Sequence, residues 1–269
     1  IAVTAALSDL AAVGAEPIGL LLSVTLPTRD AEAAQEAVAR GAAEAAREAR
    51  TWVLGGDTNE GSALSVGCSA AGLVPADSVL TRMGARPGEG VFVTGPLGLG
   101  AARAAAAFLG DPSLLPEEEF RPPCRLAHGR ALRGVASAAM DTSDGLLATL
   151  DQLARLNGIA IRITRPEGEL LHPRAAPAGL RTGLSPLALL AVLHGEFELV
   201  FTIPDSGRPA LDAEAARLDW APLEIGITEP GRGLFAGDRP IDGARVRNLF
   251  SECRGDMGAY AAALREIAT

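Results

Sequence analysis

The sequence predicts a mixed α/β (α+β) protein built from two lobes, and three observations lead to this prediction. The chain has 269 residues, of which 48% are hydrophobic, enough for one large core or two smaller ones. Apolar stretches typical of strands alternate with alanine-rich stretches typical of helices. A segment rich in proline and glycine lies within 76–90, so we expect lobes at 1–80 and 81–269.

The first lobe is expected to contain two helices and three strands. Residues 1–14 are rich in alanine and leucine and stop at Gly14, a residue suited to the left-handed conformation that ends helices. Residues 30–49 have alanine at most positions and charged residues on one side, which predicts an amphipathic helix. Strands are expected at 18–25, 52–54 and 64–74, and the second is expected to end at Gly55-Gly56-Asp57.

The second lobe is expected to open with a strand at 91–94, a Gly95-Pro96 turn and a helix at 98–109. An apolar run at 135–140 then leads through the acidic segment 141–145 into a helix at 146–157. The remaining elements expected are helices at 124–133, 185–194, 209–217 and 256–267, and strands at 159–164, 197–203 and 223–228.

The charge balance excludes several classes of protein. The chain has 33 acidic and 24 basic residues, a net charge of −9, and every base is arginine. No nucleic-acid partner is expected at this charge. The absence of lysine excludes a Walker-type phosphate loop, a protein-kinase strand lysine and a Schiff-base enzyme, because each requires one.

The sequence predicts a soluble protein of the reducing cytoplasm, with no membrane partner. Its apolar stretches are interrupted well before the ~20 residues that a membrane span needs, and its start has no secretory signal pattern. The three cysteines, Cys68, Cys124 and Cys253, are widely spaced, which favours neither a zinc site nor a disulfide framework. Cys68 falls in an apolar strand and is expected to be a buried, inert thiol.

Acidic residues at the ends of predicted elements are candidate magnesium ligands. They form four clusters, Ser8-Asp9, Gly55-Gly56-Asp57-Thr58, Asp141 and Ser143-Asp144-Gly145. Magnesium prefers oxygen ligands and bridges to phosphates. Because an acidic chain does not attract a triphosphate, bound divalent ions would have to reverse the local charge, which is also what phosphoryl transfer requires.

Each cluster has an alternative structural interpretation. Asp9 can serve as an early-helix acid or a partner of the helix cap. Gly55-Gly56-Asp57 can be an ordinary turn, and 141–145 can be a loop that caps the following helix. Taken singly, the clusters leave both interpretations open.

Taken together, the motifs resemble those of thiamine-monophosphate kinase, a family of the aminoimidazole ribonucleotide synthetase (PurM-like) superfamily. The resemblance runs over roughly 1–235, and its most specific piece is Asp141-Thr142-Ser143-Asp144-Gly145-Leu146. The other matching segments are Ser8 to Ala15, Gly55 to Thr58, Leu80 to Gly88 and Val91 to Gly95. The resemblance implies two α/β lobes and a homodimer in which first-lobe strands of both subunits form a shared barrel.

The resemblance also implies roles for individual residues. The metal ligands would be Asp9, Asp57, Asp141 and Asp144. The ATP contacts would be Gly56, Asp57, Ser143 and Arg82, with Arg82 on the phosphates, and Asp144 and Arg82 would be catalytic. Glu196 would contact the substrate. The implied reaction is transfer of the ATP γ-phosphate to thiamine monophosphate, with Mg²⁺ as the metal.

The sequence departs from the family pattern in three ways. The family's Gly-Asp-Asp and Thr-Asp motifs, which precede the residues present here, have no replacement. The acidic substrate segment is one position shorter, at His194-Gly195-Glu196-Phe197-Glu198-Leu199. The aromatic residue that stacks on the acceptor has only Phe250 and Tyr260 as candidates. Two other functions therefore stay open, a related enzyme with another acceptor and a noncatalytic nucleotide-binding dimerisation module.

Two expectations concern arrangement in space. Asp57, Asp141 and Asp144 should share one cleft, since a common metal-phosphate site requires them to converge. The apolar strand within 18–24 should contribute to a symmetric dimer interface. The three histidines, His128, His172 and His194, have no metal-ligand spacing and are interpreted as structural.

Overall fold

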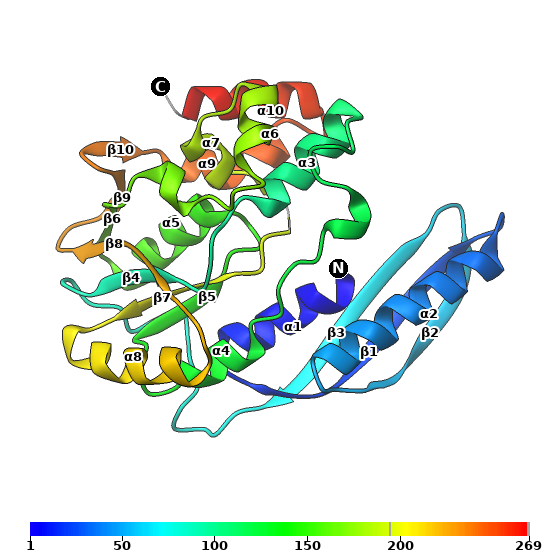
Figure 1. Cartoon of the computed structure of the whole chain (residues 1–269), viewed down its shortest axis with the longest axis horizontal. Coiled ribbons are helices and arrows are strands. Elements are labelled where there is room, and N and C mark those ends of the chain that lie inside the picture. Colours follow the sequence, from blue (N-terminus) through cyan, green and yellow to red (C-terminus); the bar gives the residue numbers. More distant parts are fainter. Residues whose placement is uncertain (194, 268–269) are drawn as a thin grey trace.

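The computed structural model describes residues 1–193 and 195–267, which form two β-sheets with helices packed against them. A three-stranded sheet belongs to the first part of the chain, and a seven-stranded sheet belongs to the rest (Figure 1). His194 lies outside the described residues. The mixed α/β class predicted from the sequence is confirmed.

The first sheet has the strand order β2-β1-β3. Strand β1 (Glu16–Pro27) pairs in parallel with β2 (Val53–Gly61) and antiparallel with β3 (Ser65–Leu73). Helix α2 (Ala31–Glu48) makes the crossover between the two parallel strands. It shares one apolar cluster with helix α1 (Ala2–Ala12), so both helices lie on the same side of the sheet.

The prediction that the second strand ends at Gly55-Gly56-Asp57 was wrong, because these residues lie inside β2. The glycines suggested a turn, but here they allow close strand pairing. Gly56 pairs with Leu22 of β1 next to a register shift, and a Cβ atom at Gly56 would lie 1.9 Å from the Leu22 carbonyl oxygen. Glycine is therefore required for close approach of two backbones rather than for a change of chain direction.

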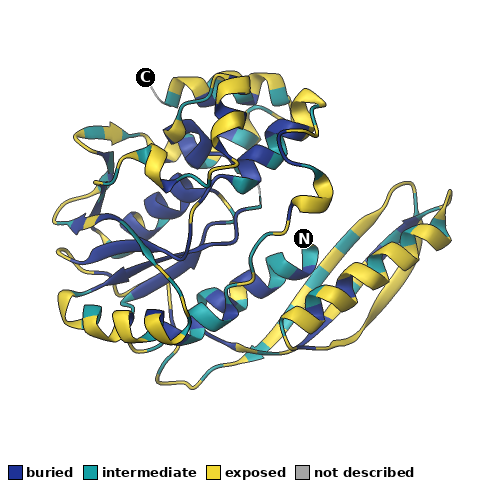
Figure 2. Ribbon diagram, viewed as in Figure 1, coloured by how far each residue is buried: buried dark blue, intermediate teal, exposed yellow. Residues whose placement is uncertain are grey.

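The second sheet has the order β10-β9-β6-β8-β4-β7-β5, and only its β6–β9 pair is parallel. Its strands are β4 (Gly90–Val93), β5 (Ala138–Asp141), β6 (Ala160–Ile163), β7 (Leu199–Ile203), β8 (Leu223–Glu229), β9 (Gly233–Ala236) and β10 (Arg239–Ile241). Every residue of β4, β5 and β7 is buried, which explains the largely apolar sequences of these strands (Figure 2).

Alternate side chains of these strands enter two different apolar clusters. Val91 and Val93 of β4 face a cluster formed with α5 (Leu146–Asn157), whereas Phe92 faces a cluster formed with α1. The first cluster also receives α3 (Leu99–Leu109), α7 (Pro186–Leu190), α9 (Gly243–Glu252) and α10 (Met257–Ile267). The second receives α4 (Leu126–Ala131) and α8 (Arg208–Arg217). Helices thus cover both faces of the sheet (Figure 1).

Four elements were not predicted from the sequence, namely α6 (Ala176–Thr182), α9, β9 and β10. Both strands are short, and they pair across Gly237 and Asp238 at the edge of the sheet. Helix α9 has a polar composition and buries only Gly243, Val246 and Leu249. Elements so short or so polar carry little periodic signal, and tertiary contacts decide their structure.

The side of the first sheet away from its helices is open in the single chain. Along β3, exposed Ser69, Ala71 and Leu73 alternate with half-buried neighbours, and Leu21 of β1 is 53% exposed. Figure 2 shows this sheet mostly exposed, in contrast to the buried strands β4, β5 and β7 of the second sheet. Cys68 is half-buried, so the prediction of a buried thiol was wrong for the single chain. None of the described helices is long and apolar enough to cross a membrane.

Helix α1 connects the two sheets, since it contacts β3 of the first sheet and β5 and α4 of the second part of the chain. The contact with α4 is very close. A Cβ atom at Gly129 of α4 would lie 1.9 Å from the carbonyl oxygen of Ala11 in α1. Glycine at this position sets the distance between the two helices.

We expect Gly129→Ala to destabilise the protein by about 1–3 kcal/mol, because the added methyl group forces α1 and α4 apart. The measurement is urea unfolding of the full-length protein. Gly41→Ala is the matched control, since Gly41 lies inside α2 with no atom within 4 Å of the new methyl group. Gly41→Ala should raise the free energy of unfolding by about 0.5–1 kcal/mol, because alanine has a higher helix propensity than glycine. Equal effects of the two substitutions would show that the α1–α4 distance is not constrained at Gly129.

Candidate active site around Asp141

The predicted acidic segment joins strand β5 to helix α5. Asp141 is the last residue of β5, Gly145 precedes α5 with a φ of 86°, and a Cβ atom at Gly145 would lie 2.8 Å from the Val192 carbonyl oxygen. Glycine is therefore required here by both conformation and space. The turn places residues 141–144 directly before the N-terminal end of α5, where the helix dipole favours negative charge.

Asp141 is held by the first part of the chain. Its side chain is buried, and its Oδ2 accepts a hydrogen bond of 2.9 Å from the Ser8 hydroxyl on α1. The Ser143 side chain also hydrogen-bonds to it. The hydrogen bond from Ser8 joins residues 133 positions apart in the sequence, and nothing in the local sequence predicts it.

Three of the four predicted metal ligands lie close together. Burial raises the pKa of Asp141, the hydrogen bonds from Ser8 and Ser143 lower it, and the nearby carboxylates of Asp9 and Asp144 raise it further. Asp9 and Asp144 are both exposed. The arrangement therefore concentrates negative charge between α1 and the start of α5.

This donor set fits a divalent cation such as Mg²⁺. All three side chains offer carboxylate oxygens, which are the ligands that Mg²⁺ prefers, and two of them are open to water and to other ligands. A bound cation would also offset the mutual repulsion that raises the pKa of Asp141. Within the described part of the chain, no group of three or more acidic, histidine or cysteine side chains is arranged to hold a metal ion, so these three aspartates do not form a metal site by themselves in the single chain.

Asp57 and Arg82 lie elsewhere in the single chain. Asp57 is exposed on β2, the edge strand, where it accepts a hydrogen bond from Asn59 and lines a pocket with Gln35 of α2. The Arg82 carbonyl accepts a hydrogen bond from Asn157, the last residue of α5. Asp144 lies two residues before the start of this 12-residue helix, so the helix length of about 18 Å separates Asp144 from the Asn157 side that binds the Arg82 carbonyl. The single chain thus groups Asp9, Asp141 and Asp144 without the other two.

Glu196 is directed into the protein at the start of α3. The residue is only 8% exposed, and its carboxylate accepts a 2.6 Å hydrogen bond from the Gly100 amide. Burial raises the pKa of Glu196 to about 7, the Gly100 hydrogen bond lowers it, and the negative charge of Glu198 raises it. Its contacts are those of a carboxylate at the N-terminal end of a helix, and its role toward a substrate stays a prediction.

A small pocket opens beside Asp144. It has a volume of about 190 Å³, and its walls come from α5, α9 and the segment before residue 194. Its lining residues are Asp144, Ala148, Gln152, Leu193, Val246, Arg247 and Phe250. Of the two aromatic candidates, Phe250 lines this pocket. Tyr260 is buried, with its ring perpendicular to that of Phe250 and its hydroxyl accepting from the Leu193 amide.

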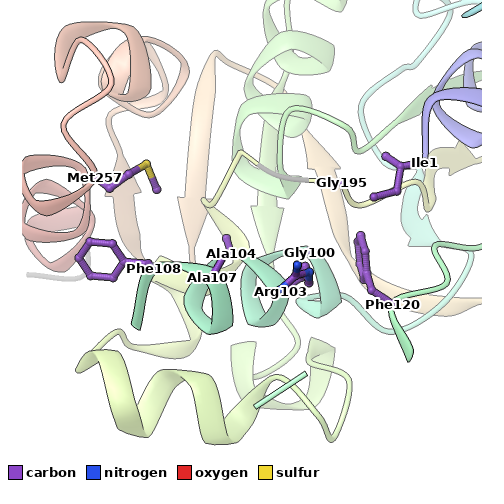
Figure 3. A pocket seen from close by; sticks show the side chains of 9 residues that line it. All are labelled: Ile1, Gly100, Arg103, Ala104, Ala107, Phe108, Phe120, Gly195 and Met257. Carbon is purple, nitrogen blue, oxygen red and sulfur yellow. The ribbon is translucent and has the colours of Figure 1, made fainter. Parts of the chain in front are cut away.

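A larger pocket of about 530 Å³ runs along α3 (Figure 3). Phe108 and Met257 lie toward one end, and Phe120 and Ile1 toward the other (Figure 3). Gly195 contributes to its wall beside Phe120, but none of the predicted site residues lines it. Among the described residues that line it, Arg103 has a charged side chain, which forms an ion pair with Glu117.

His128 has a structural environment, as its interpretation from the sequence anticipates. Its ring packs edge-on against Trp220 at a centroid distance of 4.8 Å, and burial lowers the pKa of His128 to about 4. A histidine that stays neutral through physiological pH in an apolar cluster contributes packing rather than acid–base chemistry.

Comparisons with known proteins identify the family of the chain. A family profile for the AIR synthase related protein, N-terminal domain, matches residues 1–74. A thiamine-monophosphate kinase from Salmonella typhimurium is 36% identical over 225 residues, covering 79% of this chain and 66% of the relative. Another from Haemophilus influenzae is 30% identical over 258 residues, covering 93% of this chain and 76% of the relative. The chain thus spans slightly less than two thirds of the Salmonella relative.

A solved structure of AaThiL complexed with AMPPCP and TMP has a similar fold. Its TM-score is 0.73 at 26% identity, and the match covers 88% of this chain and 75% of the other. The two-sheet fold and the profile match define a member of the AIR synthase-related class of proteins. Within that class, the chain belongs to the thiamine-monophosphate kinase family.

We expect Glu196→Gln to stabilise the protein at pH 8 by about 1–3 kcal/mol and to have little effect at pH 4.5. Folding raises the pKa of Glu196 to about 7, so the stabilisation from its proton is complete below the ordinary pKa and is lost as pH rises through 7. The glutamine stays neutral and can still accept from the Gly100 amide. Urea unfolding across this pH range measures the difference.

Glu229→Gln is a control of opposite sign. The Arg162 side chain holds the pKa of Glu229 below its usual range, so its carboxylate stabilises the fold above that range and the substitution should destabilise the protein at pH 8. If Glu196→Gln also destabilised at pH 8, the carboxylate at the start of α3 would be charged and favourable there, contrary to the prediction.

Proposed function

We propose that the protein catalyses ATP-dependent phosphorylation of thiamine monophosphate to thiamine diphosphate. An oxygen of the acceptor phosphate attacks the γ-phosphorus of ATP, and ADP leaves. The observation that carries the proposal is the grouping of Asp9, Asp141 and Asp144 in a chain of this family. The complex of the related AaThiL with an ATP analogue and TMP supports the same pair of substrates.

Asp9, Asp141 and Asp144 would hold Mg²⁺ in this reaction. The metal supplies charge neutralisation for the phosphates when bound. Ser8 and Ser143 keep the buried carboxylate of Asp141 oriented through their hydrogen bonds. Asp144 is exposed next to the pocket that Phe250 lines, so we assign it the position nearest the transferred phosphate. We infer a further contact of Ser143 with ATP.

A homodimer would complete the nucleotide site. The open side of the first sheet carries Leu21, Ala71 and Leu73, an apolar surface typical of an interface. We propose that two copies meet through this surface, and that residues 1–80 form an ATP- and metal-binding lobe. Asp57, Gly56 and Arg82 would contact the nucleotide or its metals in that assembly. The cytoplasm is the proposed location.

The pocket beside Asp144 fits the ring system of the acceptor. It combines the aromatic wall of Phe250 with the apolar side chains of Leu193 and Val246, and Gln152 offers an amide for hydrogen bonds. An aromatic ring with polar substituents requires this combination of a hydrophobic wall and few polar groups. Its position next to Asp144 would place the acceptor phosphate near the metal site.

We expect the full-length protein with Mg-ATP to convert thiamine monophosphate into the diphosphate, and Asp144→Asn to lower kcat by at least about 100-fold, as loss of charge stabilisation does elsewhere. Product formation measured by chromatography gives the rate. Arg82→Ala should weaken ATP binding about tenfold in the same preparation, the equivalent of one charge-assisted contact. Wild-type turnover no faster than that of Asp144→Asn would refute the kinase assignment.

The two pockets can be distinguished by a pair of phenylalanine substitutions. We expect Phe250→Ala to raise KM for thiamine monophosphate about tenfold or more, because it removes the aromatic wall. Phe108→Ala in the pocket along α3 is the matched control and should leave KM within about twofold. ATP affinity should be unchanged in both. The reverse pattern would assign the acceptor to the pocket of Figure 3.

The shortened segment before Leu199 favours testing other acceptors as well. If the wild-type protein binds Mg-ATP but does not phosphorylate thiamine monophosphate, ADP release with other phosphate or carboxamide acceptors would identify a related enzyme. If no acceptor supports ADP release, the chain acts as a nucleotide-binding dimerisation module.

A further inference from the structure

Glu198 has a different environment from the other acidic residues near the site. It is only 3% exposed, yet three hydrogen-bond donors surround its carboxylate. Arg125 donates from Nε to Oε2 at 2.8 Å and from Nη2 to Oε1 at 2.6 Å, and the Thr94 hydroxyl also donates to Oε2. A two-point pairing of this kind fixes both the distance and the orientation of the two groups.

The space for this ion pair is provided by Gly95. A Cβ atom at Gly95 would lie 2.7 Å from Nη2 of Arg125 and 3.1 Å from Oε1 of Glu198. The turn after β4 therefore brings its backbone directly against the paired charges. With its charge balanced and its oxygens occupied inside the protein, the Glu198 carboxylate is not available as a metal ligand.

The backbone of Glu198 holds the acidic segment. Its carbonyl oxygen accepts hydrogen bonds from Thr142, at 2.9 Å from the amide and at 3.1 Å from the hydroxyl. Thr142 lies between Asp141 and Ser143, and its own carbonyl accepts from the Gly145 amide at 2.8 Å. The position of Glu198 thus determines where the turn between β5 and α5 lies.

The other partner of the ion pair is connected to α1. Arg125 immediately precedes α4, and Gly129 of the same helix packs against the Ala11 carbonyl of α1. On α1, Ser8 donates to Asp141. The contacts therefore form a closed circuit that runs from Glu198 through Thr142, Asp141, α1 and α4 to Arg125, and the ion pair closes it.

From this circuit, and resting on the metal site of the proposed function, we propose that the Arg125–Glu198 pair is a positioning device for that site. It sets the separation between Asp9 on α1 and Asp141 and Asp144 on the second part of the chain. Neither residue contacts the metal or the nucleotide. Loss of the pair would open this circuit, so that only the Ser8–Asp141 hydrogen bond and the packing of α1 against β5 would hold α1 to the 141–145 turn.

The test is Mg²⁺ binding by the full-length protein in the presence of ATP, measured by titration calorimetry together with amide hydrogen exchange at 141–145. Glu198→Gln should raise the Mg²⁺ dissociation constant at least tenfold and speed exchange of the Thr142 amide. Glu229→Gln is the matched control, because Glu229 of β8 pairs with Arg162 of β6 through two hydrogen bonds of 2.9 and 2.8 Å. It should leave Mg²⁺ binding within twofold.

Arg125→Gln separates positioning from direct ligation. It frees the Glu198 carboxylate, so a direct metal role for Glu198 predicts unchanged or tighter Mg²⁺ binding, whereas positioning predicts weaker binding. Weaker binding in both Glu198→Gln and Arg125→Gln supports the proposal. Unchanged or tighter binding in Arg125→Gln overturns it.

Arg125→Lys provides a milder variant if the others fail to fold. It keeps the charge but loses the two-point geometry, so Mg²⁺ binding should weaken by about threefold or more, and unchanged binding would overturn the proposal. These Mg²⁺-binding measurements do not depend on which acceptor the protein uses. Normal Mg²⁺ binding without phosphorylation of thiamine monophosphate would refute the proposed function alone. Turnover in the wild type, together with unchanged Mg²⁺ binding in the variants, would refute only the positioning role.

Discussion

The placement of helix α1 is the constraint on which the rest of the site depends. This helix contributes Leu7 and Ala11 to the apolar cluster that joins the two sheets, and it carries both Ser8 and Asp9. The same packing that buries one face of the helix therefore brings a carboxylate and a hydroxyl to the end of β5. Because closely packed helices have little freedom to shift, the packing of the core sets the relative positions of the aspartates.

Two buried carboxylates, those of Asp141 and Glu198, lie close to this junction and have different partners. Asp141 is buried near two other carboxylates, an arrangement that is unfavourable until a cation joins it. Glu198 is also buried, but Arg125 compensates its charge. These two carboxylates, on adjacent strands β5 and at the start of β7, thus have opposite functions: one is left in need of a cation, and the other is neutralised by the protein.

Glycines at three contacts make this arrangement possible, and each excludes a side chain for a different reason. Gly129 allows α4 to approach α1, Gly95 leaves room for the ion pair, and Gly145 combines a positive φ with a close carbonyl. The exclusive use of arginine as the basic residue is compatible with this arrangement, because a guanidinium can pair with a carboxylate at two points and a lysine ammonium cannot. The absence of lysine therefore does not weaken the internal pairing on which the proposed site relies.

The sequence by itself determined the fold class, most of the regular elements and the candidate aspartates. Helix α5 and the turn before it were predicted closely, because an apolar run, an acidic turn and a helical period follow one another without a competing signal. Only the tertiary structure decided which candidates meet. It placed Asp9 beside Asp141 and Asp144, put Gly55-Gly56-Asp57 inside a strand, and left Arg82 at the far end of α5. It also showed the Arg125–Glu198 pair, which joins residues 73 positions apart. Such contacts depend on how helices and strands pack, and a local sequence pattern carries no information about partners so distant in the chain.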